Sequence, residues 1–171
     1  MGIKVRPAEA ADMENCAALY KHIYDTTYRG VVDPRVITSV QQEDSVARLR
    51  AKWLDLGAEM YVAEDVQDEA EPVFLGYVYG LPSPDVLGAF WLESLYLNEA
   101  ARGMGLGKRL IEMMKDTARN QGYQQMVIDV FTGNDAAEQI YEHLGAVHIN
   151  DDYIEDVNDF PVQAKLLIWD L

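Results

Sequence analysis

The sequence predicts one α/β (α+β) domain, in which a mixed central sheet of about seven strands is flanked by about four helices. Two observations support this fold class. Strand-like and helix-like segments follow one another in the order β-α-α-β-β-β-α-β-α-β-β, without an internal repeat or a linker. A chain of 171 residues is long enough for one compact core and too short for two ordinary domains, so residues 1–171 are expected to form a single domain.

The first half of the chain predicts four strands and two helices. Residues 3–8 are strand-like, and residues 13–23 carry apolar side chains at helical spacing. A single helix is expected over residues 34–56, because its apolar side chains share one face and Gly57 follows as a stop signal. Three further segments rich in β-branched and aromatic residues predict strands at 59–65, 73–81 and 89–97.

The second half predicts two helices and three strands. A helix begins near Leu106 with apolar residues at i, i+4 spacing, and Gly122 closes it. Asn134 is expected to cap a further helix that Gly145 ends. The remaining elements are that helix, over 135–144, and strands at 124–131, 146–150 and 164–171.

Composition excludes several classes of protein. Hydrophobic residues make up 49% of the chain, yet no apolar run reaches the roughly 18 residues of a membrane span, so a soluble protein without membrane contact is expected. The N-terminus lacks the basic and apolar segments of a secretory signal. The single cysteine, Cys16, rules out an internal disulfide and fits a reducing cytoplasm. We therefore expect a cytoplasmic protein.

The chain is strongly acidic. Fourteen Lys and Arg residues against 29 Asp and Glu residues give a net charge of −15. This balance disfavours a nucleic-acid surface and favours the approach of small cations. An anionic ligand needs a local exception to this field, and Arg102, Lys108 and Arg109 provide one around three closely spaced glycines.

Those glycines, Gly103, Gly105 and Gly107, lie between a strand and a helix. Their spacing matches neither the P-loop nor the dinucleotide fingerprint. A strand that enters a helix through glycines still presents unpaired N–H groups and the positive helix end to an anion, and bare backbone lets a diphosphate approach closely. A tight turn that binds nothing is the alternative.

Two segments resemble motifs of the GNAT superfamily of acetyl-CoA-dependent N-acetyltransferases. The stretch from Arg102 to Gly107 (RGMGLG) is similar to the family signature R/Q-x-x-G-x-G/A, in the expected position between strand and helix. The stretch from Asn134 to Gly145 resembles N-x-x-A-x-x-x-Y-x-x-x-G. Ala146 departs from the family pattern, which usually has a phenylalanine there.

This resemblance implies a mostly antiparallel sheet whose fourth and fifth strands splay apart around the pantetheine arm of acetyl-CoA. The backbone of the strand 89–97 would pair with that arm, and the glycine segment would bind the diphosphate. Asn134 and Ala137 would lie beside the cofactor. The implied cofactor-binding residues are Leu95, Tyr96, Leu97, Arg102, Gly103, Met104, Gly105, Leu106, Gly107, Lys108, Asn134 and Ala137.

Acetyl transfer to an amine needs a base, because an alkylamine with a pKa near 10.4 is protonated at pH 7. Forming the neutral amine at that pH costs roughly 4 to 5 kcal/mol of free energy. Glu93 alternates with Leu95 along its strand and is therefore expected to share its face, beside the cofactor path. The resemblance implies that Glu93 serves as base or holds the amine, and that Tyr141 protonates the departing thiolate. The alternatives are a solvent-facing glutamate and an ordinary core tyrosine.

The acceptor is expected between residues 24–30 and 151–160, opposite the cofactor. The candidate substrate-binding residues there and on the strand are Tyr24, Asp25, Tyr28, Glu93, Asp152 and Tyr153. The acidic residues of these two segments are expected to form a mouth that attracts a polyamine, an aminoglycoside or a lysine side chain. They are Asp25, Asp151, Asp152, Glu155, Asp156 and Asp159. A solvated acidic loop is the alternative. The partner is thus a small-molecule or protein amine, and a homodimer is possible.

Four further interpretations stay open or are set aside. A catalytically silent acetyl-CoA-binding module would keep the glycines, and a non-enzymatic interaction domain would leave them empty. No metal is expected, because His22, His143 and His148 lack metal-ligand spacing. Cys16 lies on an apolar helix face and is expected to be a packing residue.

Overall fold

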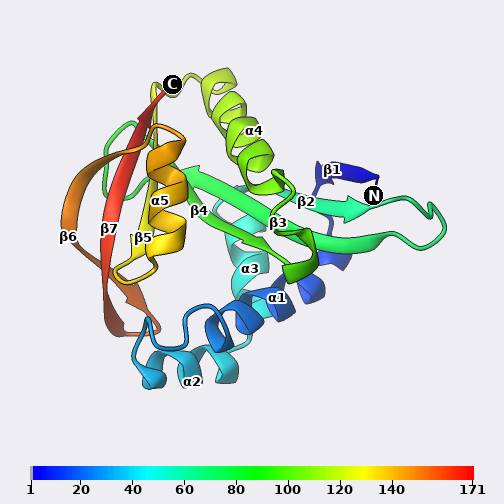
Figure 1. Cartoon of the computed structure of the whole chain (residues 1–171), viewed down its shortest axis with the longest axis horizontal. Helices are drawn as coiled ribbons and strands as arrows, with labels where there is room; N and C mark the ends of the chain where they lie inside the picture. The colour runs from blue at the N-terminus through cyan, green and yellow to red at the C-terminus, as the bar shows by residue number, and fades with distance from the viewer. Residues whose placement is uncertain (1) are drawn as a thin grey trace.

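The computed structural model describes residues 2–171. Its strands are β1 (Ile3–Pro7), β2 (Glu59–Asp65), β3 (Val73–Pro82), β4 (Phe90–Leu97), β5 (Gln125–Phe131), β6 (Val147–Val157) and β7 (Phe160–Asp170). They form one seven-stranded sheet in the order β1-β2-β3-β4-β5-β7-β6 (Figure 1). Every neighbouring pair is antiparallel except β4 and β5, which are parallel. The mixed, mostly antiparallel sheet is confirmed.

Five α-helices occur in residues 2–171, one more than expected. They are α1 (Met13–Asp25), α2 (Pro34–Gln42), α3 (Ser45–Leu54), α4 (Leu106–Asn120) and α5 (Asp135–His143), with 3-10 turns η1 (Ala10–Asp12) and η2 (Glu99–Ala101). None of these helices is long and apolar enough to cross a bilayer.

The single helix predicted over 34–56 is wrong. Glu43 adopts an extended backbone (φ −73°, ψ 157°), which ends α2. The Asp44 side chain then accepts a 3.0 Å hydrogen bond from the backbone N–H of Ala47 and caps a new helix, α3. Apolar periodicity continues across the break, so the pattern concealed a local cap that starts a second helix.

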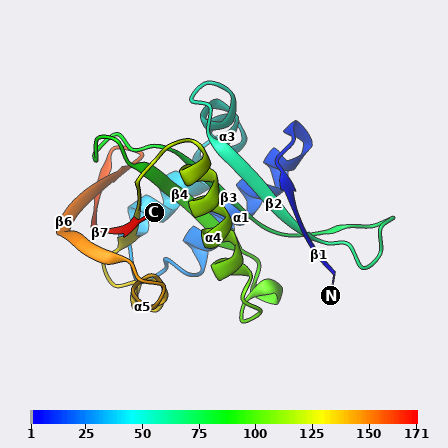
Figure 2. The same ribbon diagram turned by 90° about the horizontal axis from the view of Figure 1, so that it is seen from above.

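The helices cover the two faces of the sheet. Helices α1, α2 and α3 pack on one face, where Met13 and Leu49 meet Tyr77 in one core cluster. Helix α4 packs on the other face, where Leu110 meets Leu167 in a second cluster. In Figure 1, α4 lies above strands β2–β4 and α1 and α2 lie below them. Both views place the edge strands β1 and β6 at opposite ends of the molecule (Figures 1 and 2).

Strands β4 and β5 separate almost as soon as they meet. They pair only at Phe90 with Met126 and at Trp91 with Val127. Beyond these pairs the two strands spread apart, as Figure 1 shows. The splay that the family resemblance implied is therefore present, and the β5-facing edge of β4 beyond Trp91 has no strand partner within residues 2–171.

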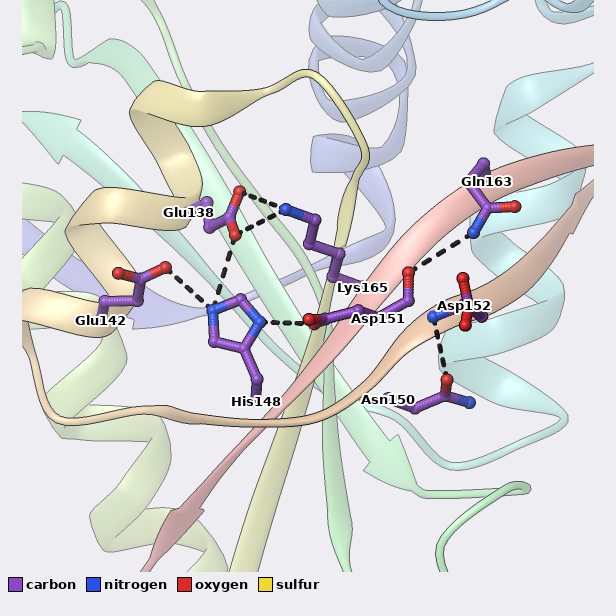
Figure 3. A network of polar contacts seen from close by, with 8 residues as sticks. All are labelled: Glu138, Glu142, His148, Asn150, Asp151, Asp152, Gln163 and Lys165. Atoms are coloured by element: carbon purple, nitrogen blue, oxygen red, sulfur yellow. Dashed lines mark hydrogen bonds and ion pairs between the residues drawn. The ribbon is translucent and has the colours of Figure 1, made fainter.

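Helix α5 has no fully buried residue, and ionic contacts add to its apolar packing on the sheet (Figure 3). Lys165 Nζ on β7 donates to Glu138 Oε1 at 2.9 Å. The His148 ring on β6 lies 2.8 Å from Glu142 Oε1 and 2.6 Å from Asp151 Oδ1. These contacts attach the helix to the β6–β7 hairpin and fix its orientation.

This network makes stability depend on pH. Hydrogen bonds that the His148 ring donates to Glu142 and, with a smaller effect, to Asp151 raise the pKa of His148. A raised folded-state pKa gives stabilisation that is complete below the unfolded value of about 6.5 and is lost as pH rises through the folded value. His148→Gln should therefore lower Tm more at about pH 6 than at about pH 9.

Thermal unfolding of wild type and variant across this range measures the difference. His143→Gln, a change at an exposed histidine at the end of α5, is the control and should show no such pH dependence. A Tm difference for His148→Gln that is constant or grows with pH contradicts the assignment.

Candidate active site

A groove of about 300 Å³ opens where β4 and β5 separate. Leu95 and Leu97 of β4 form one side, and Ala137 and Tyr141 of α5 form part of the other. Gly107, in the first turn of α4, lies at the groove as well. The groove thus connects the unpaired strand edge with the glycine-rich start of a helix.

The free edge of β4 can accept an added extended chain. The backbone N–H of Asn98 donates to Leu75 O on β3 at 2.7 Å, so Asn98 directs its backbone toward β3. Because backbone groups alternate between the two edges of a strand, Leu97 and Leu95 direct theirs toward the groove. An extended ligand with amide groups would pair there as an extra strand does.

The start of α4 has the geometry of an anion site. Gly103 and Gly105 adopt left-handed backbone conformations, with φ of 76° and 74°, which explains why this turn contains glycine. The first backbone N–H that takes part in the helical hydrogen bonding is that of Arg109, which donates to Gly105 O at 3.1 Å. The amides of 106–108 precede it and have no partner among residues 2–171, and Arg102 and Lys108 are exposed beside them.

The predicted cofactor-binding residues come together around this groove. Those that line it are Leu95, Tyr96, Leu97, Arg102, Gly107, Asn134 and Ala137. The exposed residues Gly103, Met104, Gly105 and Lys108 lie next to Arg102 and Gly107 in the chain. The Leu106 side chain is buried in the core, so only its backbone is available to a ligand.

A second, smaller cavity of about 50 Å³ adjoins the groove. Tyr28, Tyr96, Asn134 and Tyr141 line both spaces. The wall of this inner cavity is aromatic, since the rings of Tyr24 and Tyr28 lie 4.8 Å apart and the Tyr28 and Tyr96 hydroxyls are 3.4 Å apart. Its basic and acidic side chains are those of Arg48, Glu93, Asp129 and Glu155.

Glu93 lies in the inner cavity, but the reasoning that placed it there is wrong. A β-bulge between β3 and β4 pairs Gly80 with Leu92 and Tyr79 with Ser94, so Glu93 is an extra residue. The bulge changes the alternation of the strand. Leu95 consequently packs on the α4 side of the sheet, whereas Glu93 contacts Lys52 of α3 on the other side.

Glu93 and Lys52 form a largely buried ion pair. The Lys52 ammonium contacts Glu93 Oε1, and the two side chains are 21% and 5% exposed. The other oxygen, Glu93 Oε2, is buried and has no hydrogen-bond partner among residues 2–171. Burial and then the nearby Arg48 charge lower the pKa of Lys52 to about 8. One carboxylate oxygen is therefore neutralised while the other stays available.

Tyr141 lies where groove and inner cavity meet. Its ring makes an edge contact with Trp169 at 6.1 Å between centroids, which fixes the side chain against the core. Burial, with a smaller effect from the charge of Asp129, raises the pKa of Tyr141 to about 12. The phenol thus keeps its proton at neutral pH and can donate it.

A carboxyl pair closes the far side of the inner cavity. Asp129 accepts a 2.9 Å hydrogen bond from Trp91 Nε1. Burial, then the hydrogen bond and charge of Asp129, raise the pKa of Glu155 well above its usual range. Sequence reasoning missed Asp129, Arg48 and Lys52 as site residues. An aspartate within the apolar strand 125–131 and two cations four residues apart on one helix were the available signals.

Asn134 does not cap α5 with its side chain, contrary to expectation. Its backbone (φ −85°, ψ 66°) is not the extended conformation of a usual N-cap, and its side chain accepts no hydrogen bond from the first turn. The Asn134 side chain lies instead at the junction of groove and inner cavity.

The acidic mouth predicted around 151–160 does not form as expected. Along β6, Tyr153, Glu155 and Val157 face inward while the residues between them are exposed. Among the acidic residues predicted to form this mouth, Glu155 alone lines the inner cavity within the described residues. Asp25 pairs with Arg29 on the surface, Asp152 is exposed, and the Tyr153 hydroxyl donates to Asp85 at 2.6 Å.

Cys16 and the histidines lie away from the catalytic candidates. Cys16 is fully buried, and burial raises the pKa of its thiol to about 12, which confirms a packing role. His148 lies with Glu138 and Glu142, whose ligand atoms are within 4.8 Å of one another and of the ring. The spacing of histidines alone did not disclose this cluster. Its members pair with each other and with Lys165, and the absence of a metal stays a prediction.

Comparisons with known proteins agree with this geometry. The model of the Acetyltransferase (GNAT) family matches residues 18–146. An L-methionine sulfoximine/L-methionine sulfone acetyltransferase from Pseudomonas aeruginosa is 29% identical over 149 residues, covering 85% of this chain and 80% of the relative. A phosphinothricin N-acetyltransferase from Streptomyces viridochromogenes is 26% identical over 147 residues, covering 84% of this chain and 73% of the relative.

Solved structures share the fold. The PaiA N-acetyltransferase from Thermoplasma acidophilum, in complex with coenzyme A, superposes with a TM-score of 0.75 at 16% identity, and both chains are fully covered. A GCN5-related N-acetyltransferase from Rhodopseudomonas palustris superposes with a TM-score of 0.78 at 17% identity, covering 100% of this chain and 97% of that one. Family motifs, splayed strands and the match over residues 18–146 lead to one conclusion: the chain belongs to the GNAT family of acetyltransferases.

Proposed function

We propose that this protein transfers the acetyl group of acetyl-CoA to the amine of a small molecule, by direct attack in a ternary complex. The observation that carries the proposal is the junction at Tyr141, where the groove along β4 opens into the inner cavity. Donor and acceptor would approach each other from these two spaces. Holding them aligned supplies much of the rate acceleration, and no covalent enzyme intermediate is needed.

The residues around the groove fit acetyl-CoA, which supplies an activated acetyl thioester. The backbone of Leu95 and Leu97 would pair with the amides of the pantetheine arm. The amides of 106–108 would bind the diphosphate, and Arg102 would add a charge-assisted contact. Apart from the glycine itself and its chain neighbours, no heavy atom of the described residues lies within 4 Å of the position that a Cβ of Gly103 or Gly105 would occupy, so the backbone there is open to a ligand.

Glu93 would receive the proton of the amine. Its buried Oε2 has no partner in residues 2–171, whereas Oε1 contacts Lys52. As the new N–C bond forms and the C–S bond breaks, the amine proton passes to Glu93 and the Tyr141 phenol protonates the sulfur. A backbone N–H of β4 near Leu95 would stabilise the developing oxyanion.

The acceptor is proposed to be a small molecule. The inner cavity is only about 50 Å³ and is enclosed by tyrosine rings, which suits a compact amine better than a protein segment. The relatives named above act on L-methionine sulfoximine, L-methionine sulfone and phosphinothricin, all small molecules. Without the predicted acidic mouth, the case for a polyamine or an aminoglycoside is weaker.

Two measurements test the function together. Calorimetry should show acetyl-CoA binding, and thiol release should rise with at least one amine from a panel of amino acids, L-methionine sulfone, polyamines and aminoglycosides. Binding without amine-dependent thiol release would identify a catalytically silent module. Absence of binding would remove the acetyltransferase account and favour an interaction domain.

Tyr141→Phe should lower kcat by about 100-fold or more, since a positioned general acid contributes roughly 10²–10⁴-fold. Its affinity for acetyl-CoA in calorimetry should change little, because only a hydroxyl is removed. Tyr123→Phe is the matched control: this tyrosine packs against Phe90, outside both cavities, and its loss of a hydroxyl should leave kcat unchanged. Wild-type turnover in Tyr141→Phe excludes the acid role.

Glu93→Gln should move the pH–rate profile toward alkaline pH. Without the carboxylate, only the amine already neutral in solution reacts, so kcat/KM should rise with pH up to the amine pKa of about 10. Glu99→Gln removes an exposed carboxylate just beyond the end of β4 and serves as control. A profile that coincides with wild type leaves Glu93 without the role of base.

A further inference from the structure

The inner cavity contains polar atoms that have no partner in the protein. Tyr20 Oη, Arg48 Nη1 and Glu93 Oε2 are buried, and no residue of 2–171 forms a hydrogen bond with any of them. All three side chains line the same cavity. Buried polar groups are nearly always hydrogen-bonded, so a cluster of this kind indicates a ligand that supplies the missing partners.

Arg48 is the most informative member of this cluster. Its guanidinium lies 4.6 Å from the centroid of the Tyr20 ring, and no carboxylate of the described chain lies within ion-pairing distance. Four other arginines pair with carboxylates, namely Arg6, Arg29, Arg35 and Arg119. The remaining three, Arg50, Arg102 and Arg109, are exposed to solvent, whereas Arg48 is largely buried. A largely buried guanidinium that lacks such a partner is costly, and an anion from outside the protein would compensate it.

The unpaired groups of the cavity therefore need two kinds of partner. Arg48 and the Tyr20 hydroxyl are donors that call for an anionic oxygen, since guanidinium matches a carboxylate with two parallel hydrogen bonds. Glu93 Oε2 is an acceptor that calls for an N–H group. Asp129 lines the same cavity and keeps it favourable for a cation on that side. A ligand that carries an ammonium group and a carboxylate meets both demands.

We propose that the acceptor is an amino acid whose carboxylate binds Arg48 and Tyr20 while its amino group faces Glu93 and the acetyl donor. This inference rests on the proposed acetyltransferase function and narrows it from amines in general to amines that carry a carboxylate. It makes Arg48 a specificity-determining residue. Amines without the anionic group would leave the guanidinium uncompensated and bind weakly.

Binding to a dead-end complex tests this without turnover. Calorimetry on the protein saturated with coenzyme A would compare each amino acid of the panel, L-methionine sulfone included, with its carboxamide. The carboxamide keeps the amine and the side chain and replaces the charged carboxylate with a neutral amide group of similar size. We expect at least one amino acid to bind about tenfold or more tightly than its carboxamide, the loss typical of a hydrogen-bonded ion pair.

Variants then assign the preference to Arg48. Arg48→Met should abolish the preference for the acid over the carboxamide, and Arg48→Lys should restore part of it. Arg50→Met is the matched control, because Arg50 lies exposed on the same helix and its loss changes net charge equally. Coenzyme A affinity and Tm, measured for each variant, show that fold and cofactor site are intact.

The outcomes separate this inference from the proposed function. Carboxamides that bind as tightly as the acids, an unchanged preference in Arg48→Met, or binding of polyamines alone would overturn the amino acid assignment while leaving acetyl transfer to amines intact. Failure to bind acetyl-CoA would instead remove the function on which the inference rests. A preference that is lost in Arg48→Met and kept in Arg50→Met supports the assignment.

Discussion

The separation of β4 from β5 after two residue pairs is the constraint on which the rest of the site depends. Continued pairing would bury the edge of β4 and close the groove. Because the strands part, backbone groups of Leu95 and Leu97 face an open space rather than a neighbouring strand. The same opening lets Tyr141, on peripheral helix α5, face both the groove and the inner cavity.

Charge is distributed around this opening in a way that net charge does not reveal. The chain carries −15 overall, yet its inner cavity contains the Arg48 cation, and Lys52 lies behind Glu93. Lys52 pairs with one carboxylate oxygen of Glu93 and leaves the other oxygen without a partner among the described residues. The bulge in β4 lets Glu93 face α3 while Leu95, two residues later, faces α4 and the cofactor groove.

Much of the fold and the cofactor groove could be predicted from the sequence, because both depend on local signals. Gly103 and Gly105, before Leu106, adopt left-handed backbone conformations that glycine adopts easily. Strand periodicity identified the seven strands. The remaining features depend on tertiary geometry. No local pattern encodes the bulge at Glu93, and apolar periodicity ran through the break at Asp44. The sequence gives no sign that Arg48 differs from other helix residues, because its position in the inner cavity depends on the tertiary fold.

The most direct test is a crystal structure of the protein with acetyl-CoA. The account predicts the pantetheine arm between β4 and β5, hydrogen-bonded to the backbone of Leu95 and Leu97, with the diphosphate on the amides of 106–108 and the thioester beside Tyr141. Density for the cofactor in another part of the molecule, or a diphosphate far from the start of α4, would contradict it.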